Sequence, residues 1–205
     1  MSRRPYHHGN LREALLDHAL QAVAEHGPAG WSLRDLARRA GVSHAAPAHH
    51  FGDKRGLLTA IATDGYTRLA AELDAAWQAT GSFLEVGVAY VEFAVGHRAH
   101  FEVMFRPELY DANNDDVRAA RQKSGAALYG GVRTVAGAAT RHDDRTGGLA
   151  AWSIVHGFAS LWITGALPPG LSADPAAATR QVAGVLFSHP ETGAGPRPVQ
   201  RTDDS

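Results

Sequence analysis

Residues 32–51 read SLRDLARRAGVSHAAPAHHF, and their pattern predicts two short helices joined by a tight turn. Ser32 has a hydroxyl that can accept a hydrogen bond from a free backbone N–H at a helix start, and Asp35 completes a capping box. Gly41 ends the first helix in the left-handed conformation, and Val42 supplies an apolar residue for the corner. Two helices around such a turn have the layout of a helix-turn-helix, a motif that reads DNA.

The second helix of the pair is predicted over residues 44–50, with Ser43 as its cap. This helix is rich in small residues and imidazoles on the side away from Phe51, so it can approach a DNA groove closely while presenting donors and acceptors. Pro47 falls in the first turn, where its missing N–H costs little. A plain helical hairpin also shows caps and a glycine turn, so the motif alone leaves a purely structural role open.

The flanking sequence extends this pair into a three-helix unit. Residues 10–26 form an amphipathic helix that Gly27 and Pro28 close, and residues 54–78 form a second, much longer one. The long helix begins directly after the helix-turn-helix. We therefore expect a small headpiece that is rigidly tied to the domain that follows.

Three stretches of the chain resemble a known family. They are YHHGNL at residues 6–11, GVSHAAPAHHFGDKRGLL at residues 41–58 and AWSIVHGFASLW at residues 151–162. The first two resemble the tetracycline-repressor (TetR) type of bacterial transcriptional regulator. The third resembles the Trp-x-x-x-His-Gly motif of one of its C-terminal subfamilies, and the resemblance as a whole covers roughly residues 6–188.

This resemblance implies an all-α homodimer built from two domains. Residues 1–56 would form the DNA-binding headpiece, with the helix-turn-helix at about 32–51. A long helix would join it to a C-terminal domain at residues 57–188, which dimerises and often holds a small effector. Residues 189–205 are rich in Gly and Pro and are expected to be disordered.

The candidate DNA-binding residues lie in and beside the helix-turn-helix. The resemblance assigns phosphate contacts to His50 and Lys54, and it also shows a departure, because Ala48 stands where the family commonly has a phosphate-contacting Tyr. Arg3 and Arg4 are a possible arm for the minor groove. The full set of candidates is Ser32, Arg34, Ser43, His44, Ala45, Pro47, His49, His50 and Lys54.

Charge is distributed unevenly along the chain, although the formal net charge is only −1. Residues 1–56 carry eight Arg and Lys against five Asp and Glu, a formal charge of +3, whereas the remainder carries twelve basic and sixteen acidic residues. Seven of the twelve His also lie in residues 1–56. This asymmetry favours a polyanionic partner for the headpiece, although a solvated helix face would also account for it.

Beyond residue 81 the sequence predicts further helices. They cover residues 83–95, 98–105, 117–140, a stripe over 149–163, and a last helix that Asp174 and Pro175 begin; residues 109–116 are a polar loop. By resemblance, the last two helices pair with those of a second copy. The expected interface residues are Trp152, Val155, Ala159, Trp162, Ile163, Val182, Val185 and Leu186.

A largely apolar effector pocket is the corresponding hypothesis for the interior of the C-terminal domain. Its candidate residues are Tyr90, Phe93, Phe101, Met104, Phe105, Trp152 and His156, and ordinary core packing is the alternative for each of them. His97 and His100 have a spacing compatible with metal binding, and Glu102 lies nearby. No third fixed ligand is evident, so no metal site is predicted.

Other function classes find little support in the sequence. The chain lacks Cys, which excludes disulfides and thiolate chemistry, and it has no apolar run of about 18 residues for a membrane span. No catalytic or nucleotide-binding motif is present, so neither an enzyme nor a cofactor is predicted. We expect a cytoplasmic repressor that a small effector releases from a palindromic operator; an architectural or activating DNA-binding protein without an effector is the alternative.

Overall fold

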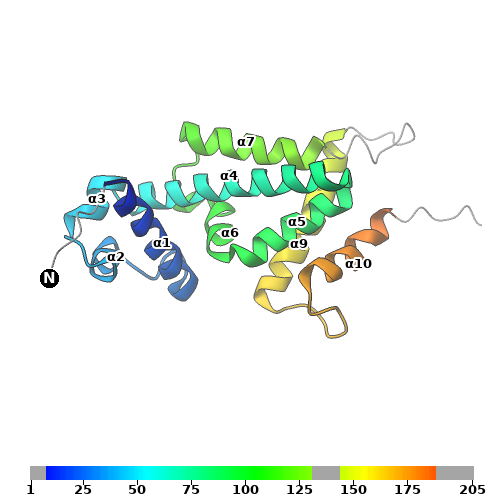
Figure 1. Ribbon diagram of the computed structural model, residues 1–205. Coiled ribbons are helices and arrows are strands. Elements are labelled where there is room, and N and C mark those ends of the chain that lie inside the picture. Colours follow the sequence, from blue (N-terminus) through cyan, green and yellow to red (C-terminus); the bar gives the residue numbers. More distant parts are fainter. Residues whose placement is uncertain (1–7, 131–143, 188–205) are drawn as a thin grey trace, which may run out of the picture.

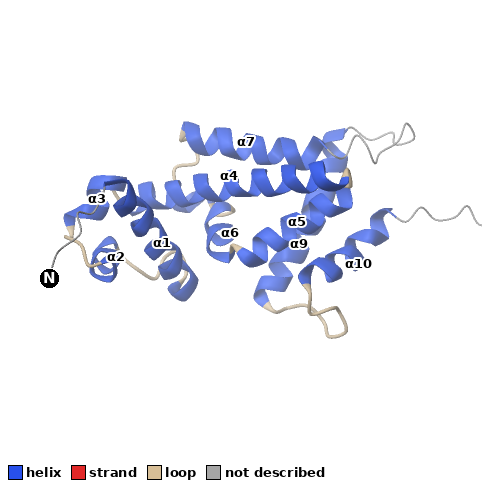
Figure 2. Ribbon diagram, viewed as in Figure 1, coloured by secondary structure: helices blue, strands red, loops and turns tan. Residues whose placement is uncertain are grey.

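The computed structural model describes residues 8–130 and 144–187, and all regular elements in these ranges are helical (Figures 1 and 2). The all-α prediction is therefore confirmed. The elements are α1 (His8–His26), α2 (Leu33–Ala40), α3 (Ala45–Phe51), α4 (Lys54–Thr80), α5 (Phe83–Gly96), α6 (Arg98–Met104), η1 (Pro107–Leu109), α7 (Asp115–Gly130), α9 (Asp144–Thr164) and α10 (Pro175–Phe187).

The headpiece consists of α1, α2, α3 and the first turns of α4, at the left of Figure 1. Its apolar residues converge on one cluster because each helix turns a single stripe inward. Leu15 and Val23 of α1, Leu36 of α2 and Leu57 of α4 are all at most 1% exposed. The three-helix unit predicted around the turn is thus present.

Helix α4 connects the two ends of the molecule. The Asp53 side chain accepts from the Gly56 N–H at 2.7 Å, and Gly81, with φ of 60°, ends the helix in the left-handed conformation. Its 27 residues correspond to a rod of about 40 Å. Along the C-terminal domain α4 packs against α5, α6 and α7 (Figure 1).

The remaining helices build the C-terminal domain around α5. Helix α5 packs against α9 and α10 as well as α4, and Glu85 of α5 forms a bidentate ion pair with Arg180 of α10 at 2.7 and 2.8 Å. The side chain of Asp174 caps α10 by accepting from the backbone N–H groups of Ala176 and Ala177. This confirms the predicted start of the last helix.

Some boundaries differ from the sequence-based prediction. Helix α7 begins at Asp115, two residues before the predicted start, because the Asn114 side chain accepts from the backbone N–H groups of Asp116 and Val117. Its described part ends at Gly130, and residues 131–143, the predicted tail at 189–205 and the Arg3–Arg4 arm lie outside the described residues.

None of the described helices is long and apolar enough to cross a membrane. The domain division near residue 56 stays a prediction. Leu57 and Leu58, at the start of the predicted C-terminal domain, belong to the same continuous core as the headpiece residues. Helix α6 also touches α1, so the headpiece contacts the larger domain at a second place besides α4.

Candidate nucleic-acid interface and ligand cavity

The turn between α2 and α3 has the predicted geometry. Ser32 accepts from the Asp35 N–H at 3.2 Å, while the Asp35 carboxylate accepts from the Ser32 N–H at 3.3 Å, which completes the capping box. Gly41 has φ of 65°, and the Val42 N–H donates to the Ala37 carbonyl at 3.0 Å. Val42 packs partly buried against the core, as a corner residue should.

Helix α3 begins one residue later than predicted, and two of its expected site residues need correction. His44 is the N-cap residue and no side chain caps the helix, so the predicted capping by Ser43 is wrong. Pro47 is buried and cannot belong to the groove face, because it points into the headpiece while its neighbours point outward. The exposed face consists of His44, Ala45, Ala48 and His49, at the outer end of the molecule (Figure 1).

The basic side chains of the headpiece divide into paired and unpaired ones. Arg38 pairs with Asp35 at 3.0 Å and Arg39 with Glu25 at 2.7 Å. Arg34 and Arg55 are exposed and form no ion pair within the described residues. Arg55 was not among the predicted contacts, although its place beside Lys54 in the sequence was a usable signal.

Lys54 occupies an internal site. Its ammonium donates to the backbone carbonyls of Ala29 at 3.2 Å and Trp31 at 2.6 Å, and it lies 4.4 Å from the centre of the Trp31 ring. Burial lowers the pKa of this group. Lys54 therefore ties the start of α4 to the α1–α2 connection, while His50, predicted beside it as a phosphate ligand, is half-buried next to Phe51.

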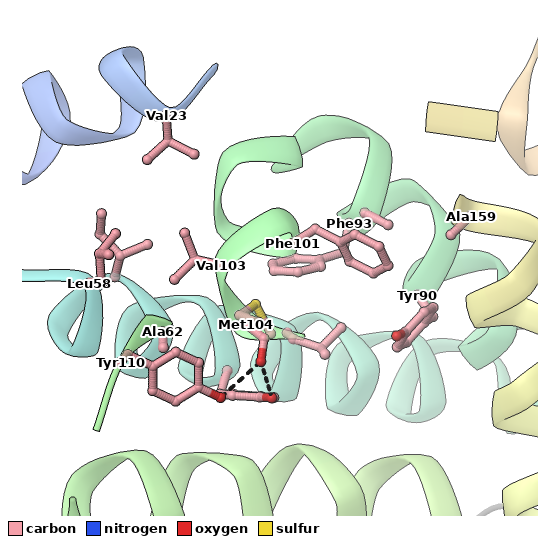
Figure 3. Packing of buried hydrophobic residues seen from close by; sticks show 14 of the residues in the cluster. Val23, Leu58, Ala62, Tyr90, Phe93, Phe101, Val103, Met104, Tyr110 and Ala159 are labelled. Carbon is pink, nitrogen blue, oxygen red and sulfur yellow. Dashed lines mark hydrogen bonds between the residues drawn. The ribbon is translucent and has the colours of Figure 1, made fainter. Parts of the chain in front are cut away.

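The C-terminal domain contains a cavity of about 880 Å³ between α4 and α7, and residues of α5, α6 and α9 also line it. Four predicted residues line this cavity, namely Tyr90, Met104, Phe105 and Trp152. The other three do not line it: Phe93, Phe101 and His156 pack in the layer behind, with Phe93 1% and Phe101 6% exposed. Figure 3 shows Phe93 and Phe101 together on the far side of Met104 from α7.

The sequence prediction missed the polar side of the cavity. Tyr66 of α4 and Tyr110 after η1 both donate a hydroxyl hydrogen bond to the Met104 carbonyl, at 2.8 and 2.9 Å (dashed in Figure 3). Helix α7 adds Arg118 and Arg121. Because α7 reads as an Ala- and Gly-rich helix, periodicity gave no reason to assign it to a pocket.

A hydrogen-bonded trio of the buried Tyr90 and the half-buried Trp152 and His156 adjoins this cavity. The Tyr90 hydroxyl accepts from Trp152 Nε1 at 3.1 Å and lies 2.8 Å from His156 Nδ1. Burial raises the pKa of Tyr90 and lowers that of His156, so both side chains are neutral near pH 7. The Tyr90 hydroxyl has one hydrogen to donate and two lone pairs, so it can serve both neighbours at once, and the imidazole tautomer decides which group donates in the Tyr90–His156 bond.

The two histidines considered for a metal pair with different carboxylates of α4. His97 Nε2 lies 3.3 Å from Glu72, and His100 Nε2 lies 2.9 Å from Asp64. The hydrogen bond from His100, joined by one from Arg68, lowers the pKa of Asp64 to about 2. No group of three or more possible metal ligands occurs in the described part of the chain.

The predicted dimer residues do not all lie on an accessible face. Val155 is 7% and Ala159 0% exposed within a single chain, so neither is available to a second copy. Trp152, Trp162, Ile163 and Val182 are half-buried, Val185 is 72% exposed, and the side chain of Leu186 lies outside the described residues. Leu149 and Leu161 of α9 are 49% and 46% exposed, and neither was predicted.

Comparison with known proteins gives matches over both parts of the chain. Residues 15–61 match the family described as bacterial regulatory proteins, tetR family. Residues 83–186, just over half of the chain, match the tetracyclin repressor-like C-terminal domain. The HTH-type transcriptional repressor AcnR of Corynebacterium glutamicum is 41% identical over 61 residues, which are 30% of this chain and 32% of AcnR. The match thus spans only about a third of that relative.

Solved structures match over nearly the whole chain. A protein of unknown function from Rhodococcus sp. RHA1 is 34% identical with a TM-score of 0.75, over 90% of this chain and 97% of that one. AibR in complex with isovaleryl coenzyme A and operator DNA is 19% identical with a TM-score of 0.60, over 86% and 98% of the two chains, and shares the fold. With both of its parts matched in sequence and its helices matched in space, this chain belongs to the tetR family of bacterial regulatory proteins.

Proposed function

We propose that this chain is a homodimeric transcriptional repressor that binds a palindromic operator and is released from it by a small molecule. The observation that carries the proposal is the capped α2–turn–α3 unit, whose exposed face of His44, Ala45, Ala48 and His49 lies at the outer end of the molecule. Imidazoles can contact base edges, and the small side chains of Ala45 and Ala48 let the backbone of α3 approach the groove.

The surrounding charges support DNA as the partner. Arg34 in α2 and Arg55 at the start of α4 have no internal ion-pair partners in the described ranges, so their guanidinium groups are available to phosphates. The third N–H of the Lys54 ammonium is the remaining donor of that side chain once the two carbonyls are bound. AcnR, which this headpiece resembles, is a repressor.

The cavity favours a repressor with an effector over the architectural alternative. A domain that serves only to dimerise has no need for a hollow interior, whereas 880 Å³ lies within the range of about 300–1,000 Å³ that is usual for small-molecule sites. AibR, which has the same fold, was solved with both a small molecule and operator DNA.

We further propose that the chain belongs to the C-terminal subfamily with the Trp-x-x-x-His-Gly motif. Trp152 and His156 meet at the Tyr90 hydroxyl, which gives the motif a structural purpose beside the cavity. The four-residue spacing places both rings on one face of α9, one turn apart.

Selection of binding sites from random duplexes with the purified full chain tests the proposal. We expect an enriched palindrome whose half-sites lie about one helical turn or somewhat more apart. His49→Ala should change the ranking of bases within the half-site. Arg34→Ala should weaken every sequence alike and flatten the salt dependence, because phosphates carry no base information. Enrichment of a single asymmetric half-site, or of no sequence at all, would contradict the proposal.

A further inference from the structure

The cavity has an apolar interior with polar groups on one side. Leu69 and Leu73 of α4, Leu128 of α7 and Phe105 supply the apolar wall. The polar groups are three phenols, the Trp152 indole, Ser124, Gln122, and the Asp115, Arg118 and Arg121 side chains of α7. A molecule that fills this space needs an apolar body and one polar end.

Most hydrogen-bond donors on the polar side are already used inside the protein. The hydroxyls of Tyr66 and Tyr110 both donate to the Met104 carbonyl, and Ser124 donates to the Arg121 carbonyl at 3.0 Å. The Trp152 N–H donates to the Tyr90 hydroxyl, which is also hydrogen-bonded to His156 Nδ1. A phenol or hydroxyl that has given its hydrogen can only accept from a ligand.

The side chains of Arg118, Arg121 and Gln122 carry the remaining N–H donors that line the cavity. Arg118 has a partner, since its guanidinium lies 3.4 Å from the Asp115 carboxylate. The Arg121 guanidinium forms no ion pair or hydrogen bond within residues 8–130 and 144–187. It is near enough to Tyr66 for the two groups to interact electrostatically. Arg121 is thus the one cavity-lining cation of the described chain without a counter-charge.

The register of α7 points Arg121 inward. Val117, Ser124 and Leu128 are 1%, 6% and 6% exposed, and Arg121 falls between them at the spacing that continues this stripe. An arginine at an inward position is normally paired. The Arg121 side chain stays exposed because the inward stripe of α7 borders the cavity at residue 121.

We propose that the cavity binds an organic carboxylate with an aliphatic or arylalkyl body, and that Arg121 holds the carboxylate. This rests on the effector role proposed above and names the chemistry of the effector. A guanidinium offers parallel N–H donors that match the two oxygens of a carboxylate, and Leu69, Leu73 and Leu128 contact the apolar body. Gln122 is the neighbouring donor that completes the anion site.

The test compares acids with amides of the same shape. Hexanoate, decanoate and 4-phenylbutyrate are titrated calorimetrically into the full chain, each against its primary amide. In the unaltered protein, at least one acid should bind about tenfold or more tightly than its amide, as expected for a charge-assisted hydrogen bond. In Arg121→Gln the acid and amide affinities should agree within about twofold. Arg121→Lys keeps the charge and should retain part of the preference.

Arg118→Gln is the matched control, because it removes a cavity-lining arginine that already has a partner. It should leave the preference for acids unchanged. Equal or tighter binding of the amides, a preference that survives in Arg121→Gln, or no binding by any probe would overturn the assignment.

Operator binding, measured on the same samples, separates the two proposals. If the amides bind as tightly as the acids and also release the protein from DNA, the repressor proposal stands and the carboxylate proposal is contradicted. If the acids bind through Arg121 but DNA affinity does not change, the carboxylate site is supported and its role as an effector site is contradicted.

Discussion

At the residue scale, Lys54 illustrates how a motif match and a structural role can coincide. The resemblance assigned this lysine to a DNA phosphate, whereas two of its three N–H groups hold the carbonyls of Ala29 and Trp31. The carbonyls of the irregular α1–α2 connection have no helical partners and need hydrogen-bond donors, which the Lys54 ammonium at the start of α4 supplies. Lys54 therefore holds the start of α4 in place against the α1–α2 connection.

Lys54→Ala should lower the free energy of unfolding by about 1–3 kcal/mol, since it removes two charge-assisted hydrogen bonds and a cation–π contact. Arg55→Ala is the control. Arg55 is exposed and has no ion pair in the described chain, so its loss should change stability by less than about 0.5 kcal/mol while flattening the salt dependence of DNA binding. Urea denaturation and salt titrations measure both. Equal stability of the two variants would show that the Lys54 tie is unimportant.

His156 should make stability depend on pH. Burial lowers its pKa from the ordinary value of 6.5. Below about pH 6.5 the unfolded chain therefore binds a proton that the folded chain refuses, and the free energy of unfolding falls as the pH drops. His156→Gln should reduce the slope of unfolding free energy against pH between about 6.5 and 5. Tyr90→Phe, which keeps the half-buried imidazole of His156, should lose stability but retain the slope. A slope unchanged in His156→Gln would assign it to other groups.

At the element scale, helix ends were predictable where a short polar side chain or a glycine decides them. Ser32, Asp174 and Gly41 act as expected, because caps are local interactions that the sequence displays directly. The inward face of α3 was not predictable in the same way. A seven-residue helix has too few positions to define a stripe, so the burial of Pro47 depends on tertiary contacts.

The cavity was only half predictable for a similar reason. Aromatic and sulfur-bearing residues such as Tyr90, Met104 and Trp152 are visible as candidates, but the same residue types fill ordinary cores, as Phe93 and Phe101 do. Which of them border a void depends on how far α7 stands from α4. The separation of α4 and α7 depends on how the whole domain packs, so the hydrophobic periodicity of the sequence cannot predict it.

The close approach of α4 and α6 depends on Gly65. A Cβ at this position would lie 2.5 Å from the Met104 sulfur and 3.2 Å from the His100 Cβ, so the glycine is what lets α6 reach α4. Met104 also supplies the carbonyl that holds both Tyr66 and Tyr110. Displacing α6 would therefore disturb the cavity wall as well as the core.

Gly65→Ala should lower the free energy of unfolding by about 1–3 kcal/mol, the usual effect of overpacking a core. Gly96→Ala is the matched control within a helix, because a Cβ there meets nothing within 4 Å. It should be neutral or stabilising by up to about 1 kcal/mol. Thermal and urea denaturation compare the two. If both glycines tolerate alanine equally, α6 is free to move away from α4 at little cost.

At the scale of the whole molecule, α6 contacts both the headpiece and the cavity. It touches α1 of the headpiece, and its last residue, Met104, forms part of the cavity wall. A ligand that shifts Met104 has a short path to the headpiece through this helix, in addition to the long α4. Because two headpieces must dock on fixed half-sites of one duplex, a displacement of a few ångströms is enough to weaken binding.

That argument requires a dimer, and we propose that its contact lies on the exposed faces of α9 and α10. Leu161 of α9 and Val185 of α10 are 46% and 72% exposed, and a Cβ at Gly157, one turn before Leu161, would meet nothing within 4 Å. Small and apolar residues on two neighbouring helices allow a close, symmetric contact with a second copy.

Leu161→Glu and Ala159→Glu distinguish this face from the core two residues away. Leu161→Glu should leave the chain folded but place like charges about the two-fold axis, so that sedimentation shows monomers and operator affinity falls because one headpiece alone holds too few contacts. Ala159 is 0% exposed within a single chain, so Ala159→Glu buries an unpaired carboxylate and should unfold the domain, at a cost of several kcal/mol. A Leu161→Glu chain that still sediments as a dimer would move the contact to another surface.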